Sequence, residues 1–332
     1  MKESEWIQLI AAGCNRDPRQ INRLFECDAE ILDLNGQMWA LTLDQFSPEE
    51  DLFTSEEPEK LGANLATATL SDLLAAGAKP EFFMQGLTLP QGVDELFVRQ
   101  LTGGISGVLA EVGCSLCGGD MGTADQWRFS GFCMGRVLNN KPLSRIMPKQ
   151  PQTLWATGKF GDANFAALHN KATPRFELRY KEAQVIYQWA TACMDTSGGL
   201  MDALWWLHML NPDMRFEIDL DQVPLAPEVR KAACSGLPAE AFLLGGAGEY
   251  ELIFMVAEPL GSTGQEALEA MSAIRIGEIH DRSSGLFFRK RGKVVSEMKS
   301  APPCPREEAN REKYIQAVIG MANELFGENK VT

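Results

Sequence analysis

Residues 69–80 read TLSDLLAAGAKP, an apolar, alanine-rich run that carries one acid, Asp72. Leucines and alanines recur upstream at near-helical spacing, which predicts a helix over residues 58–76. Two other aspartates also close apolar runs, because Asp44 follows WALTL and Asp120 follows CGG. Acids at strand ends and helix starts can converge, and hard oxygen ligands suit Mg²⁺. Since no G-x-x-x-x-G-K-[ST] motif occurs, we expect nucleotide phosphate chemistry without a Walker loop.

The first half of the chain has the pattern of a compact unit of strands and helices. Residues 1–20 predict an amphipathic helix that stops near Pro18, and an Asn-Gly turn between two apolar runs predicts a hairpin. The order that follows the first helix is β-β-α-β-α-β-β. Its segments are expected at 31–34, 38–43, 58–76, 82–89, 93–112 and 113–138, the last with a Gly118-Gly119-Asp120 turn between two strands.

The second half begins after a proline-flanked segment, residues 148–151, which indicates a linker. Further strands are expected at 153–157, 214–220 and 252–256, with helices after the 158–163 turn, at 199–210 and at 305–327. We therefore expect an α+β (α/β) protein of two domains, residues 1–147 and 148–304, with a C-terminal helical segment at 305–332.

The composition is that of a globular protein with an acidic surface. Of 332 residues, 45% are apolar and 23% charged, and the net charge is −14. This charge disfavours nucleic acid and anionic membranes as partners. No run of 18 apolar residues occurs and the first residues are acidic, so the cytoplasm is the expected location.

Cysteine and histidine usage gives little sign of other chemistry. The eight cysteines are scattered, which does not resemble a disulfide framework. Cys114 and Cys117 have C-x-x-C spacing, but no second pair or nearby histidine completes a zinc site, so a strand is the preferred interpretation. The three histidines lie far apart, which disfavours histidine-based acid–base catalysis.

Several phrases together resemble the thiamine-monophosphate kinase family, of the superfamily that includes aminoimidazole-ribonucleotide (AIR) synthetase. Residues 44–80 are similar to the family's STD…NLSDxAAMGAxP stretch, and Gly118-Gly119-Asp120 is similar to its GGDT. Residues 157–163 resemble VTGxxGDSA, residues 195–200 resemble DxSDGL, and residues 249–252 resemble the end of GGEDYEL. The phrases occur in one order over roughly residues 25–255, so they are more specific together than singly.

The resemblance implies a two-domain AIR-synthase-like fold, with an N-terminal mixed-sheet domain that dimerises and a C-terminal α+β domain. It implies an ATP- and Mg²⁺-dependent phosphotransferase that converts thiamine phosphate and ATP to thiamine diphosphate and ADP, as a homodimer. It does not identify a catalytic residue. The implied metal ligands are Asp28, Asp44, Asp72, Asp120 and Asp195; the implied nucleotide contacts are Gly118, Gly119, Asp120 and Ser197; the implied substrate contacts are Asp51 and Glu249.

The sequence departs from the family on both the metal side and the substrate side. Cys27 replaces a first aspartate, Asp51 a histidine, Gly198 the second acid of SDGL, and Gly248 an acid of GGED, while Met121-Gly122 replaces two hydroxyls. Fewer carboxylates should hold fewer Mg²⁺ ions or hold them more weakly. By this argument Gly198→Asp should raise the affinity for metal.

Two alternatives to a thiamine-phosphate kinase remain open. One is another ATP-using enzyme of the superfamily, similar to hydrogenase-maturation or purine-synthesis enzymes, although the terminal cysteine of the former is absent. The other is a catalytically weakened nucleotide-binding protein. The acceptor and the number of metals are not decided by the sequence.

Individual residues also allow structural interpretations. Asp72 could be a helix-terminal acid, Glu249 a solvated turn acid, and Gly118 and Gly119 parts of a tight turn. Lys159 and Arg145 could neutralise phosphate. Trp205-Trp206 is expected to pack a helix rather than to stack on a substrate ring.

Overall fold

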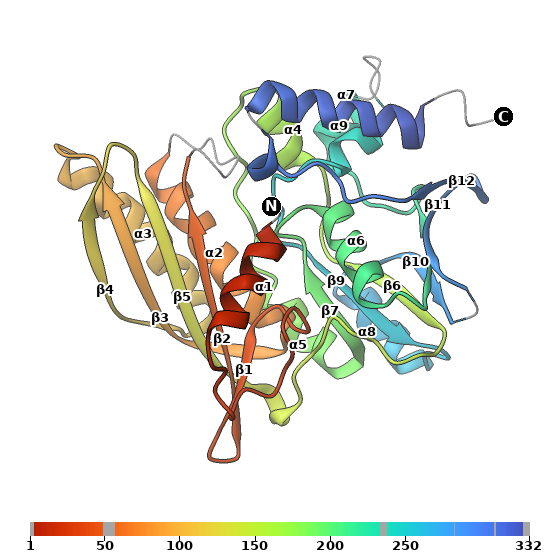
Figure 1. Ribbon diagram of the computed structural model, residues 1–332, viewed down its shortest axis with the longest axis horizontal. Helices are drawn as coiled ribbons and strands as arrows, with labels where there is room; N and C mark the ends of the chain where they lie inside the picture. Colours follow the sequence, from red (N-terminus) through yellow and green to blue (C-terminus); the bar gives the residue numbers. More distant parts are fainter. Residues whose placement is uncertain (1–2, 49–56, 233–237, 282, 309, 328–332) are drawn as a thin grey trace.

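The computed structural model describes residues 3–48, 57–232, 238–281, 283–308 and 310–327. They form a mixed α/β molecule with two sheets lying side by side, each with helices packed against it (Figure 1). In these ranges no helix is long and apolar enough to cross a membrane.

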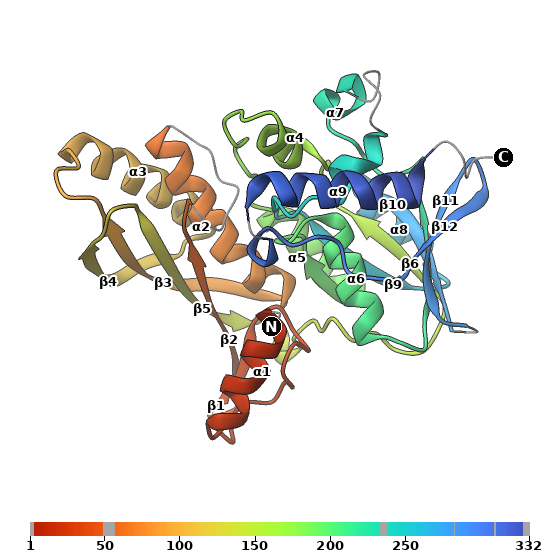
Figure 2. The same ribbon diagram turned by 45° about the horizontal axis from the view of Figure 1, so that its top comes forward.

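The N-terminal sheet has the strand order β1-β2-β5-β3-β4, in which only β3 and β4 run parallel. Two long helices, α2 and α3, cover one of its faces (Figure 2). The expected β-β-α-β-α-β-β order is confirmed. The bounds are β1 Glu30–Leu34, β2 Gln37–Phe46, α2 Pro58–Ala75, β3 Ala78–Leu89, α3 Glu95–Val112, β4 Ser115–Thr123 and β5 Arg128–Val137.

Helix α2 reaches α3 through two glycines, which allow the backbones to approach closely. A Cβ placed on Gly104 would lie 2.7 Å from the amide N of Ala63, and one on Gly62 would lie 2.9 Å from the carbonyl C of Leu101. Real side chains do not tolerate such contacts with backbone atoms, so only glycine fits at either position. The crossing fixes the position of α2, the helix that carries Asp72.

The face of this sheet opposite α2 and α3 is apolar and open. Successive residues of a strand point to opposite faces. Phe83 of β3 is fully buried under the helices, whereas its neighbours Phe82 and Met84 are 42% and 45% exposed. Leu43 of β2 shares their face and is 63% exposed.

The expected Gly-Gly-Asp turn is wrong, because Gly118, Gly119 and Asp120 lie inside β4. The two glycines instead allow an irregularity in β4 and a close approach of β4 to β3. The pairing of β4 with β3 shifts by one residue at Gly118, which has φ +155°. A Cβ on Gly119 would meet the backbone of Gln85 on β3.

The C-terminal sheet has the order β12-β11-β8-β10-β6-β9-β7, with helices on its faces. The expected strands near 153–157, 214–220 and 252–256 and the helix near 199–210 are confirmed within a residue or two. The bounds are β6 Gln152–Ala156, α4 Asp162–Leu168, α5 Tyr180–Trp189, β7 Ala190–Asp195, α6 Leu200–Leu210, β8 Arg215–Asp219, α7 Pro227–Ala232, β9 Leu252–Ala257, α8 Ser262–Ala270, β10 Ile274–His280, β11 Gly285–Lys290, β12 Lys293–Met298 and α9 Arg311–Phe326.

Both terminal helices are shorter than expected. Helix α1, Glu3–Gly13, ends five residues before Pro18, and its Trp6 and Ile10 are 50% and 65% exposed. Helix α9 begins at Arg311 rather than near residue 305, after a short 3₁₀ turn. A capping contact sets the start of α9, because the Asn310 side chain accepts a hydrogen bond from the backbone N of Lys313.

The two halves pack against each other through a shared apolar core. Phe176 and Tyr250 from the second half belong to the same buried cluster as the residues of α2 and β3. Asn64 of α2 donates to the carbonyl of Pro174 and accepts from the backbone N of Phe176, both at 2.9 Å. These contacts hold α2 against the second half, where it also packs on β7, so that Asp72 and Asp195 come to one place.

Candidate functional site

Three aspartates from distant parts of the chain converge where the halves meet. Asp28 precedes β1, Asp72 lies on α2, and Asp195 is the last residue of β7. One carboxylate oxygen from each lies within 4.8 Å of the others. We call these three residues the acid trio.

The acid trio lacks enough positive charge to balance it. Arg145 pairs with Asp28, its Nε lying 3.0 Å from Oδ1, and both side chains are largely or fully covered. The Oδ2 atoms of Asp28 and Asp195 are buried without a hydrogen-bond partner. Thr42 donates to Asp72 Oδ2 at 2.6 Å. One arginine therefore faces three carboxylates.

Burial raises the pKa of each member of the trio, and repulsion from neighbouring acids adds to the rise at Asp28 and Asp72. Burial raises the pKa of the Asp28 carboxyl to about 6, against the opposing effect of Arg145. The pKa of Asp72 rises well above its usual value through burial and then through the charges of Asp44, Asp195 and Asp28. Burial also raises the pKa of Asp195. A cation bound between them would reverse these shifts.

The residues present therefore fit a divalent cation such as Mg²⁺. They offer hard oxygen ligands, two of them buried and unpartnered, and among the described residues only Arg145 forms an ion pair with the group. Asp44 lies near enough for its charge to act on Asp72, and it faces α2 from β2. Four of the five predicted metal ligands thus belong to one region.

Asp120, the fifth, is not brought to the trio within one chain. It pairs in register with Gly86 of β3, which pairs with Ser130 of β5, and Gln45 of β2 bonds the Ser130 hydroxyl at 3.4 Å. Asp44 neighbours Gln45 on the same strand and so points to the opposite face. Asp120 therefore lies on the open face, exposed, with Gly118 and Gly119 on the same exposed strand.

Ser197 lies in the turn between β7 and α6, beside the trio. Its backbone N donates to Asp195 Oδ1 at 3.2 Å. Residues 245–248 pack directly against this turn, since a Cβ on Gly248 would lie 3.0 Å from the carbonyl C of Ser197. Glycine at 248 thus fits a close backbone approach, which the acid of the related family's motif would not allow in this arrangement.

Glu249 is not a solvated turn acid. It is 6% exposed and accepts a hydrogen bond from the backbone N of Gly161, at the start of α4. Burial, with Asp162 nearby, raises its pKa well above the usual value. Asp51, the other predicted substrate contact, lies outside the described residues.

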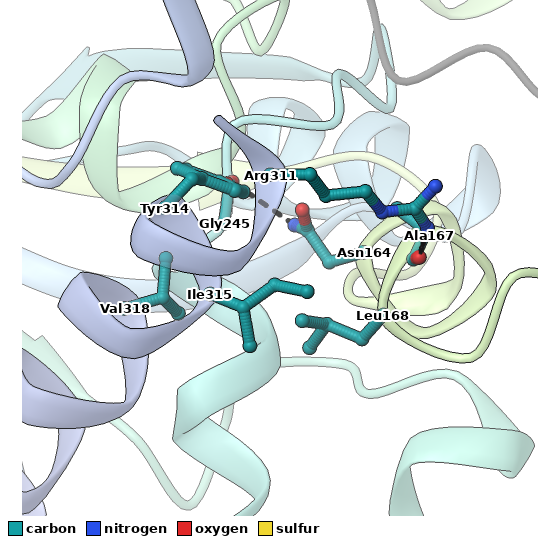
Figure 3. Close-up of a pocket in the computed structure, with 8 residues that line it drawn as sticks. All are labelled: Asn164, Ala167, Leu168, Gly245, Arg311, Tyr314, Ile315 and Val318. Atoms are coloured by element: carbon teal, nitrogen blue, oxygen red, sulfur yellow. Dashed lines mark hydrogen bonds between the residues drawn. The ribbon is translucent and has the colours of Figure 1, made fainter. Parts of the chain in front are cut away.

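A small cavity of about 10 Å³ lies beneath α9 (Figure 3). Asn164 donates to the carbonyl of Gly245 at 3.0 Å, and Arg311 donates to the carbonyl of Ala167. The Tyr314 hydroxyl accepts from the backbone N of Gly246 at 2.5 Å. The lining residues are Asn164, Ala167, Leu168, Gly245, Arg311, Tyr314, Ile315 and Val318.

The structure also shows the surroundings of the tryptophans, basic residues and cysteines that the sequence singled out. Trp205 and Trp206 pack against the C-terminal core, as expected. Arg145 pairs with Asp28, and Lys159 pairs with Asp162 at 3.1 Å. Cys114 is buried and Cys117 exposed, and among the described residues neither joins a group that could hold a metal.

Sequence reasoning missed three features of this region. The Glu251–Arg179 ion pair joins positions 72 residues apart. Tyr314 comes from a helix that matched no family phrase. Asp202 fills the space beside Gly198. Only the last had a local signal, because positions i and i+4 near a helix start face each other.

Comparison with known proteins shows which families the chain resembles. Residues 26–137 match the family described as AIR synthase related protein, N-terminal domain. The chain is 27% identical over 305 residues to the thiamine-monophosphate kinase of Pyrococcus horikoshii, covering 89% of this chain and 93% of the relative. It is 25% identical over 306 residues to that of Archaeoglobus fulgidus, covering 89% and 95%.

Solved structures show the same fold. AaThiL complexed with AMPPCP and TMP superposes with a TM-score of 0.73 at 20% identity, covering 88% of this chain and 94% of that one. The hydrogenase maturation protein HypE of E. coli gives a TM-score of 0.68 at 20% identity, covering 92% and 99%. The chain thus has an AIR synthase related N-terminal domain, is similar to thiamine-monophosphate kinases over most of its length, and has the fold of these solved structures.

Proposed function

We propose that this protein is an ATP- and Mg²⁺-dependent phosphotransferase that converts thiamine phosphate to thiamine diphosphate. The observation that carries the proposal is the acid trio, whose buried, unpartnered oxygens fit a divalent cation. Relatives named thiamine-monophosphate kinase match over most of the chain, and a related structure holds AMPPCP and TMP. The need for ATP favours the cytoplasm as the location.

The chain's own residues would bind and orient the reactants. Asp28, Asp44, Asp72 and Asp195 would hold Mg²⁺, whose charge would offset that of the transferring phosphoryl group. Arg145 would keep Asp28 in place and limit the repulsion among the acids. No side chain needs to act as a nucleophile, because positioning and charge neutralisation dominate phosphoryl transfer.

The nucleotide side of the proposal includes Ser197, Gly118, Gly119 and Asp120. The last three lie on the exposed strand β4, on a sheet whose open face carries exposed apolar side chains. A second copy of the chain that covers this face would bury those side chains. We infer a homodimer on this basis, and sedimentation analysis that finds only monomer would contradict it.

The acceptor side of the proposal includes Glu249 and Asp51. Glu249 lies next to the Gly245–Gly248 segment, which separates the β7–α6 turn from α9. The domains are proposed to divide at residues 147/148, so that the acceptor side belongs to the second domain, residues 148–304, with the terminal segment 305–332 beside it.

ADP release with thiamine monophosphate, ATP and Mg²⁺ tests the proposal directly. The expected result is ADP and thiamine diphosphate in equal amounts, and no release when thiamine monophosphate is left out. Background turnover by a well-folded protein that still binds Mg²⁺-ATP would reject thiamine phosphate as the acceptor.

A further inference from the structure

Two buried hydroxyl groups on α2 have different surroundings. Thr69 Oγ1 donates to the carbonyl of Leu65, four residues earlier, at 3.0 Å, which is a common partner for a hydroxyl inside a helix. Ser71 is only 2% exposed, yet its Oγ makes no hydrogen bond with the described residues. A buried hydroxyl without a partner destabilises the fold. Such an atom is a sign of a bound water or ion, or of stored strain.

The Ser71 hydroxyl lies beside one member of the acid trio. Ser71 directly precedes Asp72, and α2 packs on β7, which ends at Asp195. Burial raises the pKa of the Asp195 carboxyl, and the Ser71 hydroxyl is the group that opposes this rise most strongly. The two side chains are therefore neighbours, although no hydrogen bond of good geometry joins them.

Three buried oxygens without partners thus belong to one region. They are Ser71 Oγ, Asp195 Oδ2 and Asp28 Oδ2. A serine that only held Asp195 in place would donate to it, and one such bond would satisfy both atoms. A divalent cation satisfies all three oxygens at once, because carboxylate and hydroxyl oxygens are hard ligands. Serine and threonine hydroxyls hold Mg²⁺ in other nucleotide-binding sites.

We propose that the Ser71 hydroxyl is a further, uncharged ligand of the cation that the acid trio binds. An uncharged ligand raises the number of oxygens around the cation without adding to the repulsion among three acids that share one arginine. The inference rests on the proposed function in that both require a divalent cation with the nucleotide. It assigns α2 two adjacent ligands, Ser71 and Asp72.

Mn²⁺ binding with ADP tests the inference, because electron paramagnetic resonance counts free Mn²⁺ and no turnover is needed. Ser71→Ala removes the hydroxyl and keeps a good helix former. It is expected to weaken Mn²⁺ binding about tenfold. The matched control is Thr67→Val, which removes another fully buried, unpartnered hydroxyl one turn earlier on α2. The control should bind Mn²⁺ like the wild type, and an equal loss in both variants would overturn the inference.

Ser71→Cys separates direct ligation from an effect through water or packing. A thiolate prefers the softer Cd²⁺, whereas a hydroxyl prefers Mn²⁺. Competition between the two ions gives the ratio of their affinities, and this ratio should shift toward Cd²⁺ by about tenfold in the variant. The wild type sets the reference, because Cys27 and Cys193 already lie near acids of the trio. An unchanged ratio would overturn the inference.

A purely structural serine gives a different pattern. Ser71→Ala would then lower the melting temperature in EDTA and leave Mn²⁺ binding unchanged, which would overturn the inference. As a cation ligand, Ser71 is instead unsatisfied without metal, so the metal-free variant should melt no lower than the wild type. Because thiamine monophosphate is absent, failure of the kinase assay leaves these results untouched. A wild type that binds no Mn²⁺ with ADP would overturn both proposals.

Discussion

Glu251 and the acid trio differ in how fully their carboxylates are paired. Glu251 accepts hydrogen bonds from Arg179 Nε at 2.6 Å, from Arg179 Nη2 at 2.5 Å and from Thr157 Oγ1 at 2.6 Å. The acid trio shares one arginine among three acids and leaves two oxygens without partners. The Oδ2 atoms of Asp28 and Asp195 are buried, as Glu251 is, so the partners decide what each group does.

The difference separates a structural ion pair from a binding site. Glu251 and Arg179 form an ion pair that joins the segment before α5 to the residue preceding β9. The trio destabilises the folded protein as long as no cation is bound, which is the condition expected of a cation site. The predictions below alter one group while the other serves as a reference.

The largest expected effect comes from leaving Glu251 without its partner. Arg179→Ala should lower the free energy of unfolding by about 3 kcal/mol or more, because a buried charge is left unpaired. The side chains of Arg179 and Glu251 are only 14% and 7% exposed. Urea unfolding measures the loss. Arg99→Ala, which breaks an exposed pair with Glu95, should cost about 0.5 kcal/mol or less. Equal losses would contradict the account.

Removing one acid of the trio should have the opposite effect on the metal-free protein. Asp72→Asn relieves repulsion, so its melting temperature in EDTA should exceed that of the wild type. Mg²⁺ at a hundred times its dissociation constant should stabilise the wild type by about 2.7 kcal/mol. The variant should lose most of that gain in calorimetry. A variant that keeps the full Mg²⁺ response would remove Asp72 from the site.

The helix that carries Asp72 can be displaced without changing any acid. Gly104→Ala places a methyl group against the backbone of α2 and should cost about 1–3 kcal/mol. Gly103→Ala is the matched control, since nothing lies within 4 Å of a Cβ there, and it should gain about 0.5–1 kcal/mol. Thermal unfolding compares them. A stable Gly104→Ala protein would show that the crossing is looser than described.

The pH dependence gives the smallest effect. A carboxyl whose pKa is raised on folding binds more protons in the folded state, so stability falls as pH rises from its unfolded value to its folded one. For Asp28 this interval runs from 3.8 to about 6. In EDTA the wild type should therefore be more stable relative to Asp72→Asn at pH 5 than at pH 7.5. The Mg²⁺ gain should show the reverse order, because protons compete with the metal.

Much of the fold and part of the site could be predicted from the sequence. The helical spacing around Leu65 and Leu73 and the Asn35-Gly36 turn are local signals, and they gave α2 and the β1–β2 hairpin. The convergence of Asp28, Asp72 and Asp195 followed from family phrases with a fixed order. The sequence therefore predicted that these three residues are carboxylate ligands, but it did not predict their geometry.

The rest depended on features that local patterns do not encode. One extra residue in β4, at the shift between Phe83 and Met84, decides the face on which Asp120 lies, because a one-residue slip reverses a strand's faces. Without the shift Asp120 would pair with Leu87, on the helix-covered side. The filling of the Gly198 space by Asp202 depends on side-chain direction at the start of α6.

The central claim is that the acid trio is a cation site for nucleotide phosphate chemistry. Anomalous diffraction from crystals soaked with Mn²⁺ and AMPPCP tests it most directly. The account predicts a manganese peak at coordination distance from carboxylates of Asp28, Asp72 and Asp195, next to the phosphates. Well-ordered AMPPCP with no manganese at the trio would contradict it.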